Sequence, residues 1–176
     1  VPLLAILKHP LCALGEKPSA FRAAARRLER TLLRGPRPAA GTVGISHGLE
    51  HADCPDGLPE WWQGFADACA PLSAIFSQEK APLAELIKAH ISVAESLACT
   101  DEKSGADNLW RGQAGEALST FLEDLLHHAD RIDAITPQTY PALLGAALVG
   151  QAIRPQWGRH PRLSILGPLE ARLHHA

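Results

Sequence analysis

Arginines between Arg22 and Arg34 form the pattern in this sequence that is best suited to binding chemistry. Arg22, Arg26, Arg30 and Arg34 recur at intervals of four residues, and Arg27 widens the basic face. This spacing places side chains on one side of an α-helix. Guanidinium groups in such a row can contact successive phosphates of a nucleic acid without reading its base sequence. An ordinary solvated helix face is the alternative, because arginine is also a good helix former.

Charge is unevenly distributed along the 176 residues, although the net charge is only −2. Residues 17–37 carry seven basic side chains and one acidic one, whereas residues 38–150 carry five basic and sixteen acidic ones. Residues 151–176 are again mainly basic. Such asymmetry can mark a surface for nucleic acid or an acidic partner, although solvated charge is the simpler explanation. The candidate DNA contacts are Arg22, Arg26, Arg27, Arg30, Arg34, Arg37, Arg159, Arg162 and Arg172.

A second pattern, His47-Gly48-Leu49-Glu50-His51, has the H-x-x-E-H spacing of one class of zinc peptidases. That chemistry requires a helix, which places both imidazoles on one face around the metal. Because Gly41, Gly44, Gly48 and Pro55 lie in and around the motif, we expect a flexible loop and no zinc site. An independent metallohydrolase built on these side chains is the third hypothesis for the function.

Other signatures of catalysis are missing from the sequence. It contains no glycine-rich phosphate loop, no G-x-S-x-G motif and no CxxC pair. Cys12, Cys54, Cys69 and Cys99 have no regular spacing, which indicates reduced thiols. We therefore expect a non-catalytic chain that holds no cofactor and no metal.

The distribution of apolar residues predicts an all-α bundle of about six helices. Apolar residues make up 46 % of the chain and charged residues 20 %, which is a globular composition, and Leu and Ala outnumber the β-branched residues. A loop rich in Pro and Gly is expected over residues 36–59. The helices are expected over residues 2–14, 20–34, 60–76, 82–98, 108–132 and 137–149.

Individual residues refine this expectation. Pro71 should kink or split the third helix. Trp61 fits the apolar stripe of that helix and Trp62 its edge, so we expect both in or near the core, with base stacking as the alternative. Residues 137–149 are nearly all apolar and should form the most buried helix. Residues 163–166 are predicted to form a short β-strand whose partner strands lie elsewhere.

Five short segments carry a resemblance to a known family, and they occur in order along the chain. They are similar to the AddB subunit of alphaproteobacterial AddAB helicase–nucleases. The loop from Thr42 to Leu58 and residues 100–107 show no such likeness. The five segments are Pro2–Leu11, Leu33–Pro38, Leu109–Gly115, Arg154–Leu163 and Ile165–Leu173.

The resemblance implies that the chain is an internal piece of a larger, inactivated superfamily I helicase-like subunit. Residues 1–15 would then end a RecA-like domain, residues 16–158 would form an inserted all-α domain of the 2B type, and residues 159–176 would re-enter a truncated RecA-like domain. The turn Gly167–Arg172 lacks the His and Lys that precede Gly-Leu-Glu in working motors. The family's nuclease and its iron–sulfur cluster would lie outside this chain, so no cofactor is expected within it.

The resemblance also implies the partners and the setting. The partners would be the phosphate backbone of DNA and an AddA-type helicase–nuclease subunit, with no membrane. The location would be cytoplasmic and nucleoid-associated. The first hypothesis is therefore a non-catalytic domain that helps guide DNA strands during double-strand-break repair. The alternative is a structural domain that docks the partner subunit without contacting DNA.

Overall fold

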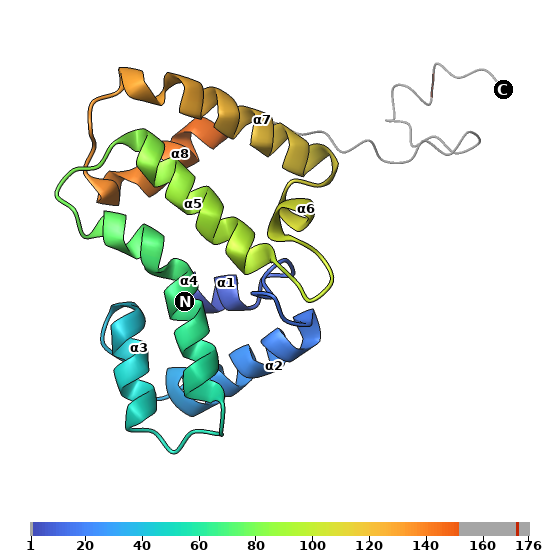
Figure 1. Ribbon diagram of the computed structural model, residues 1–176, viewed down its shortest axis with the longest axis vertical. Helices are drawn as coiled ribbons and strands as arrows, with labels where there is room; N and C mark the ends of the chain where they lie inside the picture. The colour runs from blue at the N-terminus through green and yellow to red at the C-terminus, as the bar shows by residue number, and fades with distance from the viewer. Residues whose placement is uncertain (1, 152–171, 173–176) are drawn as a thin grey trace.

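The computed structural model describes residues 2–151 and residue 172 (Figure 1). Within these residues the all-α prediction is confirmed, because no β-strand forms and only Ala81 and Ile135 make an isolated antiparallel bridge. The strand predicted over residues 163–166 lies outside the described residues. The α-helices are α1 (Pro2–Leu7), α2 (Pro18–Leu28), α3 (Gly41–Glu50), α4 (Leu58–Phe76), α5 (Leu83–Ala98), α6 (Gly105–Leu109), α7 (Gly112–His128) and α8 (Tyr140–Leu148).

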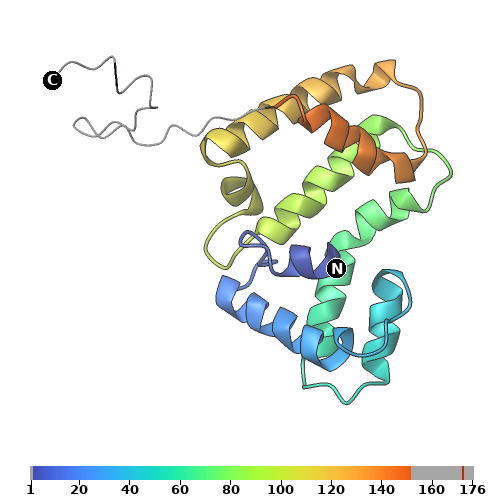
Figure 2. The same ribbon diagram turned by 180° about the vertical axis from the view of Figure 1, so that it is seen from behind.

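Two hydrophobic cores lie side by side, and α4 and α5 contribute to both (Figures 1 and 2). The first core joins α1, α2, α3 and the beginning of α4 around Phe21, Leu28 and Trp62. The second joins the end of α4 with α5, α7 and α8 around Leu86 and Ile87. A fully buried apolar side chain stabilises a fold by about 1.5–3 kcal/mol, so either core is a substantial source of stability.

Helix α4 connects the two cores and contains Pro71 in its interior. It remains a single helix of 19 residues, and Figure 1 shows it bending about halfway along. Proline removes one backbone hydrogen bond and its ring pushes against the preceding turn, which explains the bend. The bend lets Trp62 pack in the first core while Phe76 packs against the second.

The first predicted helix is too long. Helix α1 ends at Leu7, and the following residues form turns in which Leu14 and Gly15 have φ angles of 47° and 79°. Pro10 explains the early end, because it cannot donate to an extended helix. The N–H groups of Ala13 and Leu14 instead donate to the carbonyl of Leu97, at 2.8 and 3.0 Å.

The predicted loop over residues 36–59 is also wrong, because α3 forms inside it. Ile45 and Leu49 of α3 are buried in the first core. The indole N–H of Trp62 donates to the carbonyl of Thr42 and to Oγ of Ser46, at 3.3 and 3.1 Å. Each interior glycine costs a helix roughly 1 kcal/mol relative to alanine, and these tertiary contacts offset that cost.

The long helix predicted over residues 108–132 is interrupted. Two helices, α6 and α7, form in its place, and Gly112, the first residue of α7, has a φ of 69°. Nδ2 of the buried Asn108 donates to the carbonyl of Ala98 at 3.0 Å, which fixes α6 on the end of α5. Beyond the interruption, Leu118, Phe121, Leu122 and Leu125 pack in the second core, while Ala114 and Ala117 are exposed.

The most apolar helix is not the most buried one. A 3₁₀ turn (Pro137–Thr139) precedes α8, and Tyr140 is the buried residue of this helix while Val149 beyond it is 87 % exposed. The two tryptophans also exchange their predicted positions. Trp62 is buried with 1 % exposure, whereas Trp61 is half-buried at the edge of the first core.

The close packing of α6 on α5 gives a testable prediction. A Cβ atom on Gly105 would overlap the backbone carbonyl of Glu95, so Gly105→Ala should lower the free energy of unfolding by about 1–3 kcal/mol. Gly64 in α4 is exposed and faces open space, so Gly64→Ala should raise it by about 0.5–1 kcal/mol. Urea unfolding measures both changes. Equal stability of the two variants would contradict the packing described.

Candidate nucleic-acid interface

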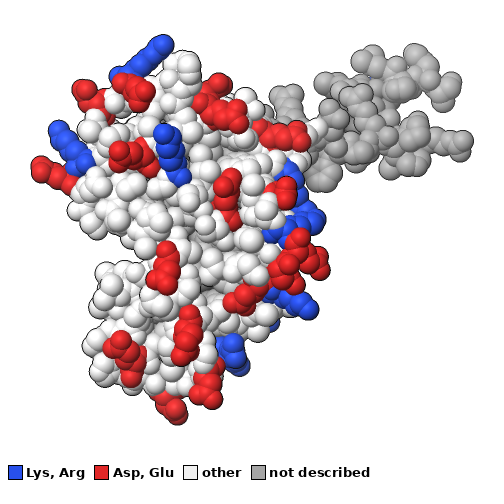
Figure 3. Space-filling model, viewed as in Figure 1, with Lys and Arg blue, Asp and Glu red and all other residues white. Residues whose placement is uncertain are grey.

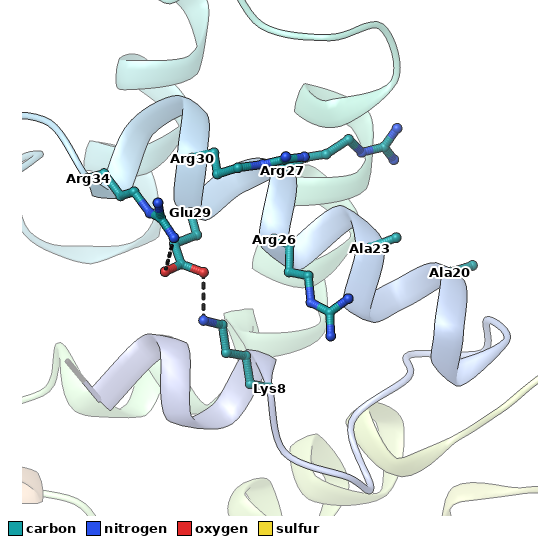
Figure 4. A pocket seen from close by; sticks show the side chains of 8 residues that line it. All are labelled: Lys8, Ala20, Ala23, Arg26, Arg27, Glu29, Arg30 and Arg34. Atoms are coloured by element: carbon teal, nitrogen blue, oxygen red, sulfur yellow. Dashed lines mark hydrogen bonds and ion pairs between the residues drawn. The ribbon is translucent and has the colours of Figure 1, made fainter.

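A basic groove runs along the outer side of α2 (Figure 4). Its volume is about 790 Å³, and five basic side chains but a single carboxylate line it. No aromatic side chain lines it, so the groove offers charge and hydrogen-bond donors without a surface for base stacking. The lining residues are Lys8, Ala20, Ala23, Arg26, Arg27, Glu29, Arg30 and Arg34.

The amphipathic pattern of α2 places this groove. Phe21, Ala25 and Leu28 are fully buried in the first core. The arginines between them therefore project from the opposite side, where Arg26 and Arg27 are exposed. Burial of one face of the helix thus fixes the direction of the basic face.

Beyond Leu28 the chain departs from the regular α-helix on which the four-residue stripe was predicted. Residues Glu29–Leu33 form a π-helical turn, and the N–H of Arg34 donates to the carbonyl of Glu29 at 3.0 Å. A π-helix pairs residues five apart along the chain. The turn therefore brings Arg34 over Glu29, and the regular stripe does not extend past Arg30.

Glu29 is the acidic centre of the groove. Its Oε2 atom lies 2.6 Å from Nζ of Lys8, and its Oε1 atom lies 3.4 Å from Nη2 of Arg34. These are the ion pairs formed within residues 2–151 and 172. The hydrogen bond from Lys8, together with the positive charges of Lys8 and Arg34, holds the pKa of the Glu29 carboxyl below its usual value.

The remaining arginines of the groove are held less tightly. The side chains of Arg26 and Arg30 make no ion pair or hydrogen bond within the described part of the chain. In Figure 4, Arg27 and Arg30 extend in the same direction from the helix, whereas Arg34 points back to Glu29. Burial raises the pKa of the Glu16 carboxyl, and the positive charge of Arg27 acts against that rise.

The predicted DNA contacts are only partly brought together. Arg26, Arg27, Arg30 and Arg34 line the groove. Arg22 is half-buried and does not line it, and Arg37 and Arg172 are exposed elsewhere. Arg159 and Arg162 lie outside the described residues.

Lys8 is the groove residue that the sequence pattern missed. It follows α1 and meets Glu29 across 21 positions of sequence. No helical periodicity connects positions so far apart, so only the packing of α1 beside α2 could reveal it. A lone lysine before a proline-containing turn carries no recognisable signal.

Acidic side chains are dispersed over the face of the molecule that Figure 3 shows. Figure 3 shows acidic side chains spread over both halves of the molecule on the face seen in Figure 1. The middle of the sequence, which is rich in Asp and Glu, therefore gives a dispersed acidic surface.

The remaining reactive side chains resemble core residues. Burial raises the pKa of the Cys12 thiol to about 12, with Cys69 adding to the rise, so this thiol stays protonated at neutral pH. Nδ1 of His90 lies 3.1 Å from the hydroxyl of Tyr140, and burial lowers the pKa of this histidine. His90 is therefore a half-buried residue held by its hydrogen bond to Tyr140 beside the second core. Across residues 2–151 and 172, no group of three or more His, Cys, Asp or Glu side chains is placed to hold a metal ion.

Comparison of the chain with protein-family models, with curated proteins and with solved structures finds no match. The resemblance to AddB therefore stays a prediction. Among the described residues, no helix has the length and apolar character needed to span a membrane.

The ion pairs of Glu29 give a prediction about pH. Because the folded state lowers the pKa of Glu29, its contribution to stability is fully present above the usual value of 4.5 and is lost as the pH falls through the folded-state pKa. The difference in unfolding free energy between the wild type and Glu29→Gln should thus shrink from neutral pH to about pH 3. Urea unfolding over this range measures it. Lys8→Ala, which removes the nearest partner, should show the same trend, and a difference independent of pH would contradict the pairing.

Proposed function

We propose that this chain is a non-catalytic, DNA-guiding domain of a recombination helicase–nuclease of the AddB type, and that the groove on α2 contacts the phosphate backbone. The observation that carries the proposal is the gathering of five basic side chains around one carboxylate in a single open groove. Such a domain would act in the cytoplasm, at the nucleoid, beside an AddA-type partner.

The chemistry of the groove favours phosphate over other ligands. Guanidinium groups bind phosphate oxygens through paired hydrogen bonds, and Arg26 and Arg30 have no competing partner within the described residues. The absence of aromatic side chains from the groove favours contact with the backbone over contact with the bases. A strand could therefore move along such a surface without sequence-specific arrest.

The alternative is a docking domain for the partner subunit. The same groove could receive acidic side chains of a partner protein, because carboxylates and phosphates bind guanidinium in similar geometry. The dispersed acidic surface seen in Figure 3 would then face basic residues of that partner. DNA binding by the isolated chain distinguishes this alternative from the first proposal.

Removal of the groove arginines should weaken DNA binding. Arg26/Arg27/Arg30→Ala is expected to lower the affinity for DNA by at least about tenfold at low salt. The slope of log K against log salt should also become shallower, by about 0.9 for each duplex phosphate that the variant no longer neutralises. Fluorescence anisotropy with single-stranded and duplex DNA at several salt concentrations measures both effects.

The matched control is Lys88/Arg111/Arg131→Ala, which removes the same charge from exposed positions outside the groove. It should retain most of the affinity and the full slope. An equal decrease of affinity in both triple variants would show that only net charge matters. Failure of the wild type to bind any DNA would favour the docking alternative, and a pull-down of the AddA-type partner would then test that alternative.

Removal of the groove carboxylate should have the opposite effect. Glu29→Gln deletes the negative charge that competes with phosphate for Lys8 and Arg34, so DNA affinity should rise by about two- to fivefold. Glu85→Gln removes the same charge from an exposed position on α5 and should change the affinity less. An unchanged or lower affinity of Glu29→Gln would contradict a phosphate site in this groove.

A further inference from the structure

We infer that the C-terminal end of α3 carries a two-histidine site for a transition-metal ion of the Zn²⁺ or Ni²⁺ type, formed by His47 and His51. This site is separate from the arginine groove and does not depend on the proposed DNA function. It follows from the helix that forms where the sequence predicted a flexible loop.

His47 in the last turn of α3 and His51 directly after the helix bring their imidazoles side by side. His47 and His51 are four residues apart, and their ring centroids are 4.4 Å apart with an angle of 30° between the ring planes. Both side chains are exposed. Two nitrogens that each bind one metal ion at about 2.0–2.1 Å must lie within roughly 3–4 Å of each other, and neighbouring rings at this separation can reach that arrangement.

A hydrogen bond prepares one of the two rings for a metal. Nδ1 of His51 lies 2.9 Å from the backbone carbonyl of His47. Because a carbonyl oxygen can only accept, Nδ1 must carry the proton, and the lone pair of the neutral ring then lies on Nε2. Metal-binding histidines are commonly oriented by such a bond from their second nitrogen.

The packing of α3 fixes the backbone from which the pair projects. Ile45 and Leu49 are buried, and Gly48 lies so close to the side chain of Leu32 that a Cβ atom would contact it at 2.9 Å. Trp62 binds the first half of the helix through its indole N–H. The backbone that carries His47 is thus fixed before the metal binds, so metal binding does not have to order it.

Charge at this end of the helix also favours a cation. His47 lies in the last turn of α3, and His51 directly follows the helix. The unsatisfied carbonyls at a helix C-terminus carry partial negative charge, which stabilises a nearby positive ion. Imidazole nitrogens are suitable ligands for zinc, nickel and copper.

The site differs from that of a zinc peptidase. Within residues 2–151 and 172 no third His, Cys, Asp or Glu is placed to complete a metal group, so two nitrogens from the protein bind the ion and water fills the other positions. We therefore propose that the site binds a metal ion, and we propose no hydrolytic reaction there.

Isothermal titration of the full chain with Zn²⁺ and with Ni²⁺ tests this site. The wild type should bind one equivalent of metal, and His47→Gln and His51→Gln should each bind it at least about tenfold more weakly. Removing even a residue that only orients a metal ligand commonly lowers the affinity tenfold or more, so loss of a ligand should cost at least as much. His127/His128→Gln removes an adjacent pair on α7 whose rings are perpendicular, at 85°, and should leave that equivalent unchanged.

A second measurement guards against misfolding. Both histidines are exposed, so the melting temperatures of the metal-free variants should match that of the wild type. Added Zn²⁺ should raise the melting temperature of the wild type and of His127/His128→Gln, but not that of His47→Gln or of His51→Gln. Equal metal affinity in His47→Gln, His51→Gln and the wild type would overturn the proposal. DNA affinity should be the same in all of them, so failure here leaves the arginine groove untouched.

Discussion

The burial of Trp62 is the interaction on which the rest of the described structure depends. Its ring fills the first core, and its indole N–H binds both Thr42 and Ser46 of α3. A buried indole N–H without a partner would cost free energy, so this bond determines where α3 must lie. Once α3 is fixed, it covers Leu32 at the end of the arginine-bearing segment. The candidate metal site is therefore positioned through this one side chain, and α3 packs against the segment that follows α2.

The positions of the charged side chains in the groove follow from packing in the same first core. Burial of Phe21 and Leu28 turns the arginines outward, and α1 brings Lys8 to the same edge. The π-helical turn then moves Arg34 toward Glu29, which leaves Arg26 and Arg30 as the groove cations without a partner among the described residues. Phosphate that entered a groove already containing one carboxylate would have to exchange ion pairs with it. Its affinity can therefore be altered in either direction by single substitutions.

Local patterns predicted much of the fold, and their failures share a cause. The helix beginning at Leu83 was predicted almost to the residue, because Pro82 precedes it and its apolar positions follow a regular stripe. Helix α3 was missed because glycine-rich segments have low helical propensity, and only contact with α4 overrides that propensity. The apolar segment of α8 was wrongly predicted to be the most buried helix. A sequence pattern shows which residues are apolar but not whether other elements cover them. Whether other elements cover them depends on the arrangement of the whole chain.

The sequence by itself determined the helical class, the basic character of α2 and the lack of an enzymatic signature, because these depend on composition and on short-range spacing. It also placed Arg26, Arg27 and Arg30 on the polar side of an amphipathic helix. Only the tertiary structure decided that Lys8 joins them, that Glu29 occupies the centre of the groove, and that His47 and His51 lie together at the end of a helix. These features arise from contacts between residues far apart in the chain or from packing that overrides local helix propensity. The periodicity of the sequence predicts neither kind of contact.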